Sequence, residues 1–168
     1  PGIDFPLEVA SRGTSVDIKE AQAALVEDKN AILNFVACRK QSREPAPESH
    51  IEFEKLNQLI HRIFASPELY RLACKRPADK EAISRMLDLR ADPTRFVRLG
   101  RTALHAAVGA DPSTLPAREP SQDLLEMLLE RNANINSVDA AMMTVLDYAD
   151  AHESADVRFK DIAAFLKK

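Results

Sequence analysis

The chain has 168 residues, a formal net charge of −3 at pH 7, 45% hydrophobic residues and 29% charged residues. This composition is typical of a soluble globular domain, and the length suits one compact domain or one solenoid of about four to five repeats. Trp is absent, aromatic residues make up only 5% and there are four Gly, which leaves little material for a phosphate-binding loop.

Residues 1–65 are expected to form helices that follow no clear repeat. A first helix includes Pro6–Ala10, Asp17 caps a second that runs to about Asp28, and a third covers about Lys29–Lys40. The prolines of the segment Gln41–Ser49 predict an exposed loop. A long helix then begins at Ser49 and is expected to end before Ser66, where Ser-Pro would cap and start the next helix.

From residue 66 onward the expected helices come in pairs. The first pair is Ser66–Cys74 and Lys80–Leu89, followed by a projecting hairpin over Arg95–Gly100. The next pair opens at Thr102 and has Ser121–Arg131 as its second helix, with a loop insertion of about nine residues over 111–120 between them. The last pair begins at Thr144 and closes with a helix over Asp156–Lys168.

Three motifs in this region resemble the ankyrin repeat. Thr102-Ala103-Leu104-His105-Ala106-Ala107 is similar to the Thr-Pro-Leu-His-x-Ala signature of that family, and Thr144–Ala149 repeats it with Asp147 in the His position. Asn132–Asn136 is similar to the family's Gly-Ala-Asp-x-Asn segment. One departure is Met142, which stands where the family has Gly.

The resemblance implies an all-α, ankyrin-type helical-repeat solenoid with short hairpin loops. About three clear repeats are expected within 66–168, together with one or two degenerate helix pairs or a helical cap in 1–65. The expected repeats cover about 66–97, 98–137 and 138–168. The spacing agrees with this division, because Tyr70 and Leu104 lie 34 residues apart and Leu104 and Leu146 lie 42 apart, one repeat plus the insertion. The resemblance also implies a structural role for His105, because the family uses the His of this motif to join neighbouring repeats.

No motif for catalysis, metal binding or cofactor binding is found. His50 and His61 are eleven residues apart, not the four that place two ligands on one helix face. Cys38 and Cys74 are expected to be buried, reduced thiols. We therefore expect no enzyme activity, no metal and no cofactor, and a cytoplasmic protein with neither a signal peptide nor a membrane span.

Charge points to a binding role instead. Residues 62–101 carry ten basic and five acidic side chains, a net +5, whereas the segments on either side are acidic. Arginines and apolar side chains alternate around the expected first hairpin, a mixture enriched at interface hot spots, and a second apolar patch lies on the next hairpin. The predicted partner-binding residues are Arg95, Phe96, Arg98, Leu99, Arg101, Ala141, Met142 and Met143, with Arg90 beside them.

The sequence thus predicts a protein–protein interaction module, a scaffold or adaptor. It would bind an acidic protein surface through its hairpin tips and the concave face of its first helices. Nucleic acid is disfavoured by the negative net charge and the few aromatic residues, and no membrane partner is expected. One alternative is the targeting arm of a larger enzyme, or of a bacterial effector delivered into the host-cell cytoplasm, whose catalytic part lies outside this chain. A weaker alternative is a self-association module.

Overall fold

The computed structural model describes residues 7–20, 25–38, 44–110, 119–154 and 156–167. Within these ranges the chain forms α-helices and one 3-10 turn, and no strand is found there. The elements are α1 (Leu7–Gly13), η1 (Ile18–Glu20), α2 (Val26–Val36), α3 (Ile51–Ala73), α4 (Lys80–Asp88), α5 (Ala103–Ala107), α6 (Gln122–Glu130), α7 (Val145–His152) and α8 (Val157–Leu166). The predicted all-α fold class is confirmed.

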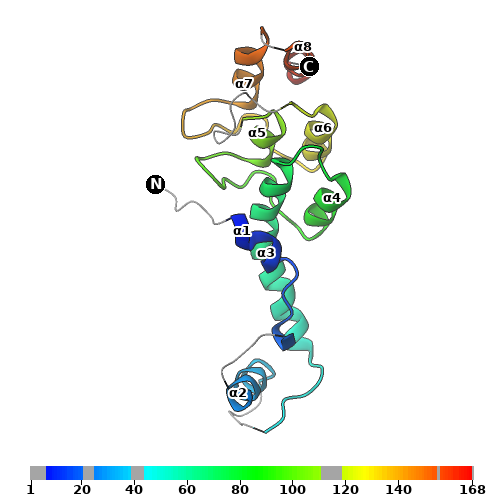
Figure 1. Cartoon of the computed structure of the whole chain (residues 1–168), viewed down its shortest axis with the longest axis vertical. Coiled ribbons are helices and arrows are strands. Elements are labelled where there is room, and N and C mark those ends of the chain that lie inside the picture. The colour runs from blue at the N-terminus through cyan, green and yellow to red at the C-terminus, as the bar shows by residue number, and fades with distance from the viewer. Residues whose placement is uncertain (1–6, 21–24, 39–43, 111–118, 155, 168) are drawn as a thin grey trace.

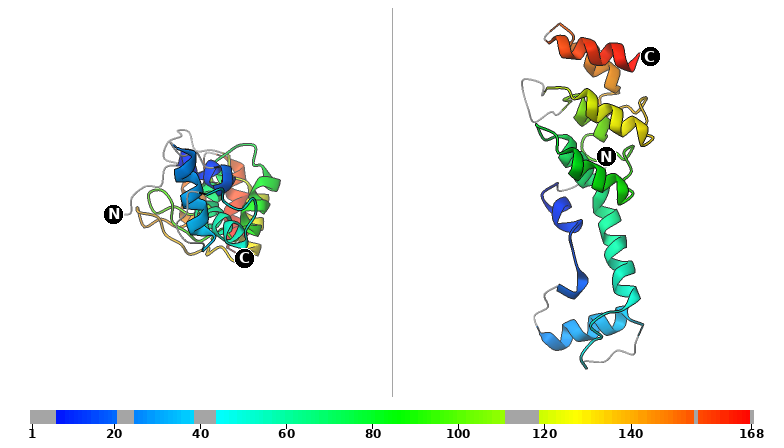
Figure 2. Two further views of the ribbon diagram at one scale, coloured as in Figure 1. Left: turned by 90° about the horizontal axis from the view of Figure 1, so that it is seen from below. Right: turned by 90° about the vertical axis from the view of Figure 1, so that its right-hand side faces the viewer.

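The long helix α3 is the spine of an elongated molecule (Figure 1). Helix α2 lies at its N-terminal end, α1 packs along its middle, and the helices from α4 to α8 are stacked at its C-terminal end. In the stack, α3 pairs with α4, α5 with α6 and α7 with α8, while α5 also contacts both α3 and α7. Figure 2 shows α4, α6 and α8 lying one above another, as expected for a helical-repeat solenoid.

One continuous apolar core runs through the stack from Ala65 to Ala163. Leucines such as Leu104 and Leu128 fill it, and the fully buried Ala107 allows neighbouring helices to approach closely. A second, separate cluster joins α2 to the start of α3 through Leu33, Ala37 and Phe53. The small residues of the Thr-x-Leu-His-x-Ala motif are therefore core residues.

The predicted helix break before Ser66 is wrong. Helix α3 passes through this point with Pro67 inside it, and the hydroxyl of Ser66 accepts the N–H of Asp92 at 2.8 Å instead of capping a helix. Residues 65–70 are all buried against the stack. The free energy of that burial outweighs the roughly 3 kcal/mol that an internal proline costs a helix. The division into 1–65 and 66–168 stays a prediction, although α3 spans the proposed boundary.

The helices before α3 also differ from expectation. Asp17 precedes the short turn η1 and accepts the N–H of Lys19 and the side-chain amide of Asn57, but no helix runs from it to Asp28, because Leu25 is not helical. The boundary expected near Asp28 falls inside α2, and α2 stops at Val36. Residues 21–24 and 39–43 lie outside the described residues, as does 111–118, most of the predicted insertion.

Neither cysteine forms a disulfide, but the burial of the two side chains is only partly as expected. Cys74 is half-buried, whereas Cys38 is exposed. Cys38 has a positive φ of 55°, which turns the chain out of α2 directly after the buried Ala37. The expectation that both thiols are buried is therefore wrong for Cys38.

Candidate partner-binding surface

The first hairpin lies between α4 and α5 and turns at Leu99 and Gly100. Both residues have positive φ, 51° and 70°, which is the signature of a two-residue turn of type I′. The N–H of Arg101 donates to the carbonyl of Arg98 at 2.9 Å, and the N–H of Val97 donates to that of Arg101 at 2.9 Å. The hairpin expected over Arg95–Gly100 is thus present, and it ends at Arg101.

The second hairpin lies between α6 and α7 and turns differently. The N–H of Met142 donates to the carbonyl of Asp139 at 2.9 Å, and Met142 itself has φ 60°. This is a turn followed by one left-handed residue, a position at which glycine is preferred. The departure at Met142 that the sequence revealed is therefore accommodated by a strained backbone.

Replacing Met142 with Gly is expected to stabilise the fold. The left-handed conformation costs a non-glycine residue about 1–2 kcal/mol, and glycine loses about 0.5–1 kcal/mol in chain entropy. The net gain of about 0.5–1 kcal/mol corresponds to a rise of about 2 °C in Tm for a chain of this size, measurable by thermal unfolding. Ala141→Gly is the control, since Ala141 has negative φ and should lower Tm. A fall in Tm for Met142→Gly would contradict this account.

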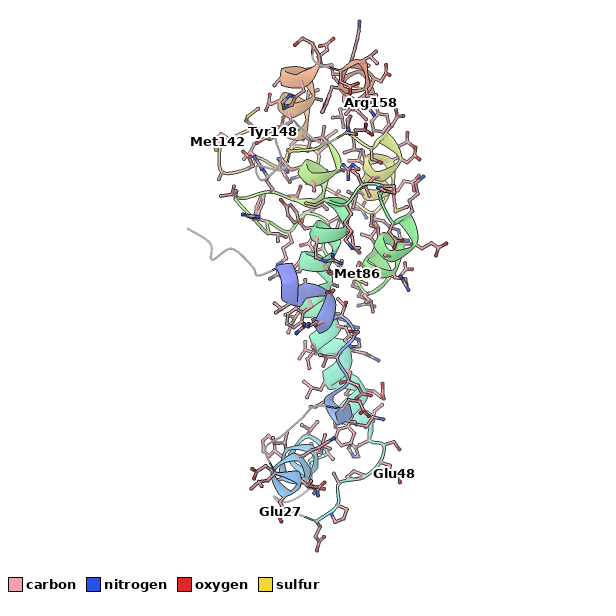
Figure 3. The ribbon with its side chains drawn as sticks, viewed as in Figure 1. Glu27, Glu48, Met86, Met142, Tyr148 and Arg158 are labelled. Atoms are coloured by element: carbon pink, nitrogen blue, oxygen red, sulfur yellow. The ribbon has the colours of Figure 1, made fainter. Side chains whose placement is uncertain are left out.

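The two hairpins touch and form one edge of the molecule. The N–H of Ala140 donates to the carbonyl of Leu99 at 2.9 Å. A Cβ added to Gly100 would lie 2.8 Å from the nitrogen of Ala140, so only glycine allows this approach. Both loops project to the same side of the stack in Figure 1, and Figure 3 marks Met142 on that side.

Most of the predicted partner-binding residues lie exposed on this edge. Phe96 is 57% exposed, Leu99 45% and Met142 75%. Arg95, Arg98 and the neighbouring Arg90 and Ala141 are also exposed, while Met143 is half-buried. Neither Arg95 nor Arg98 forms an ion pair with another residue that the structure describes. We name the exposed residues Arg95, Phe96, Arg98, Leu99, Ala141 and Met142 the hairpin edge.

Arg101 is a correction to the predicted surface. Its side chain was expected at the exposed tip, but the residue is only 8% exposed. The guanidinium lies beneath the hairpins, where Nε donates to Oδ2 of Asp139 at 3.2 Å and Nη2 donates to the hydroxyl of Tyr148 at 2.7 Å. Its Nη1 is buried and finds no hydrogen-bond acceptor among the described residues. Arg101 therefore stabilises the hairpin edge from inside the protein. It is not one of the exposed residues that a partner could contact.

Asp139 is the centre of this buried network. Its Oδ2 also accepts the hydroxyl of Tyr148 at 2.6 Å, and its Oδ1 accepts the N–H groups of Ala141 and Met143 at 2.8 and 3.1 Å. Burial alone would raise the pKa of this carboxyl. The hydrogen bonds from Tyr148, the two backbone N–H groups and Arg101 outweigh burial, so the pKa lies below its usual value. Asp139 is thus an anion that holds the second hairpin in shape.

His105 has the structural role that the family resemblance implied. Its Nδ1 accepts the N–H of Thr102 at 3.2 Å, which assigns the proton to Nε2, and Nε2 lies 3.1 Å from the carbonyl oxygen of Met143 in the next repeat. Burial lowers the pKa of the imidazole, so it is neutral at pH 7. His105 therefore joins α5 to the second hairpin and is not available as a ligand or base.

Sequence reasoning missed Asp139 and Tyr148 altogether. The available signal was local: an Asp four residues before Met143, at the start of an expected hairpin, is a residue type that bonds backbone N–H groups in turns. Nothing in the sequence indicated that Arg101, 38 residues earlier, would pair with it.

Within the described ranges, no group of three or more His, Cys, Asp or Glu side chains is placed to hold a metal ion. None of the helices described is long and apolar enough to cross a membrane.

Stacked helix pairs joined by hairpins that project to one side define a helical-repeat protein. A family model described as the ankyrin repeat matches residues 99–140, from the turn of the first hairpin through α5 and α6 to the start of the second hairpin. Residues 99–140 of the chain therefore carry an ankyrin repeat, a kind of repeat that generally binds other proteins. A search of curated proteins finds no match to the chain.

Proposed function

We propose that the chain is a scaffold or adaptor that binds an acidic protein surface through its hairpin edge and the adjoining concave face of the first helices, and that its role is binding and not catalysis. The observation that carries the proposal is the composition of the hairpin edge. Large apolar side chains and arginines alternate there on loops whose backbone is fixed by hydrogen bonds.

Rigid support makes this edge suitable for recognition. The Leu99–Ala140 hydrogen bond and the Asp139 network beneath fix both loops before a partner arrives. A preorganised surface loses less conformational entropy on binding. Phe96 and Met142 would supply buried apolar area, and Arg95 and Arg98, which lack partners among the described residues, would pair with carboxylates of the partner.

The test is the double charge reversal Arg95→Glu with Arg98→Glu. We expect it to weaken binding of the partner by about 2 kcal/mol, roughly thirty-fold in Kd, because two attractive contacts become repulsive. Partners are first captured on the full chain and identified by mass spectrometry, and the affinity of each purified partner is then titrated. Binding to the unmodified chain should also weaken as salt is added.

The matched control is Arg62→Glu with Lys160→Glu. Both side chains are exposed and lie away from the hairpins, on α3 and α8, and the change in net charge is the same. Binding should survive in the control, and both double variants should keep the Tm of the unmodified chain. A partner that binds the Arg95/Arg98 variant as tightly as the control shows that the hairpin edge is not its site.

A further inference from the structure

A groove of about 570 Å³ opens on the side of the stack away from the hairpins, between α3 and α4. Its α4 wall consists of Ala82, Arg85, Met86 and Leu89, which follow the spacing i, i+3, i+4 and i+7 of one helix face. The remaining lining residues are Glu68 and Leu72 from α3, Asp88 from α4, and Thr14 after α1. Figure 3 marks Met86 where α3 and α4 meet.

The groove lies where the stack of second helices begins. Ion pairs join α4 to α6 on one side, between Lys80 and Asp123 and between Arg131 and Asp88. On the other side of α4 no helix among the described residues takes the corresponding place, because α1 packs on α3. In a repeat solenoid, each helix pair covers the apolar face of its neighbour. The groove lies where a further helix beside α4 would provide that cover.

Among the charged side chains that line the groove, Arg85 is the one without an ion partner among the described residues. Glu68 is only 5% exposed, and its carboxylate is neutralised by Arg71 through two hydrogen bonds of 2.6 and 2.5 Å. Asp88 is paired with Arg131. Arg85 is exposed and forms no ion pair with any described residue. An occupant of the groove should therefore be an amphipathic helix with one acidic side chain on its apolar face.

Helix α2 has such a face and does not bury it. Asp28, Ala31, Ile32 and Phe35 show the same i, i+3, i+4, i+7 spacing as the groove wall. Ile32 is 54% exposed and Phe35 67%, because α2 uses its other face, with Leu33, to pack on Phe53. Asp28 is exposed and forms no ion pair with a described residue. Figure 3 places α2, marked by Glu27, at the far end of the molecule from Met86, so α2 does not fill the groove of its own chain.

We propose that α2 of one copy docks in the α3–α4 groove of a second copy, with Ile32 and Phe35 against Met86 and Leu89 and Asp28 paired with Arg85. With the two helices parallel, the matched spacing sets Ile32 opposite Met86 and Phe35 opposite Leu89, and it leaves Asp28 within about one helical turn of Arg85. Because the two contacting surfaces are different, the contact is heterologous and joins copies head to tail. This contact goes beyond the proposed function and uses none of the hairpin edge.

The test is sedimentation of the full chain over concentrations up to about 100 μM, a range suited to the weak association expected of a single docked helix. We expect the average mass to rise with concentration. Phe35→Glu and Met86→Glu should each be monomeric, yet an equimolar mixture of the two should form one-to-one dimers, because the mixture keeps one intact α2 and one intact groove. Val157→Glu, at a side chain on α8 that is 68% exposed, is the control and should associate like the unmodified chain.

A charge exchange tests the pairing without touching the apolar contacts. Asp28→Arg and Arg85→Asp should each raise the apparent Kd of self-association at least about ten-fold, and the double variant should recover most of the loss. Both side chains are exposed, so folding should be retained, which circular dichroism checks. An unmodified chain that stays monomeric, an association that survives Phe35→Glu or Arg85→Asp, or a mixture that stays monomeric overturns the proposal. None of these results bears on partner binding at the hairpin edge.

Discussion

Replacing Asp139 with Ala is expected to lower the free energy of unfolding by about 3–5 kcal/mol, the cost of leaving a buried ion without its counterion. The variant leaves the guanidinium of Arg101 buried and unpaired, and it removes the acceptor of the N–H groups of Ala141 and Met143. For a chain of this size we expect Tm to fall by about 10 °C. Chemical and thermal unfolding monitored by circular dichroism measure the loss.

Two further variants test whether the loss of stability comes from the buried network. Asp123→Ala removes the same side chain from an exposed ion pair with Lys80 and should cost at most about 1 kcal/mol. Asp139→Ala combined with Arg101→Met removes both charges and should recover part of the stability, because no buried ion is then left unpaired. If Asp139→Ala costs no more than Asp123→Ala, the buried network does not stabilise the hairpins as described.

Replacing Arg76 with Ala is expected to cost about 2–3 kcal/mol. The guanidinium donates to the carbonyls of Ala73 at the end of α3, and of Ala106 and Ala107 at the end of α5, at 2.7, 3.1 and 2.9 Å. It also donates to the carbonyl of Glu119, just before α6, at 2.8 Å. Helix C-termini leave carbonyls without partners inside the helix, and a cation there is favourable. One side chain thus joins the C-terminal ends of α3 and α5.

Arg76→Lys separates geometry from charge. Lysine keeps the positive charge but lacks the planar fork that reaches several acceptors at once, so it should recover only part of the lost stability. The control is Arg131→Ala, which removes an exposed pair with Asp88 and should cost less than about 1 kcal/mol. Equal losses for Arg76→Ala and Arg131→Ala would show that the carbonyl contacts contribute no more than a surface ion pair.

The helices and hairpins from residue 98 onward were predictable because their determinants are local. Thr102 and Thr144 begin helices, Asn132 takes the left-handed conformation with φ 63°, and Asp156 caps α8 by accepting the N–H of Arg158 at 2.9 Å. Each of these features depends on a residue's own conformational preferences and on neighbours within four positions. The positions of the two hairpins could be predicted for the same reason.

The region before residue 66 was predicted less well because distant contacts decide it. A cap at Asp17 and a break at Ser66 were reasonable local inferences. Asp17 does accept the N–H of Lys19, but it also bonds to Asn57, forty residues away, and begins only a short 3-10 turn. The buried environment of residues 65–70 carries α3 through Pro67. In both places a contact between elements competed with a local preference and outweighed it.

The candidate site divides in the same way. The sequence by itself determined that arginines and large apolar residues lie together on a hairpin, and Phe96, Arg98 and Leu99 are exposed there. Only the tertiary structure decided that Arg101 turns inward, because its ion partner Asp139 arrives with the next repeat. Likewise, only the stacking order leaves the α3–α4 groove uncovered. Local conformational preference is encoded residue by residue, whereas burial and pairing of charge depend on which elements pack together.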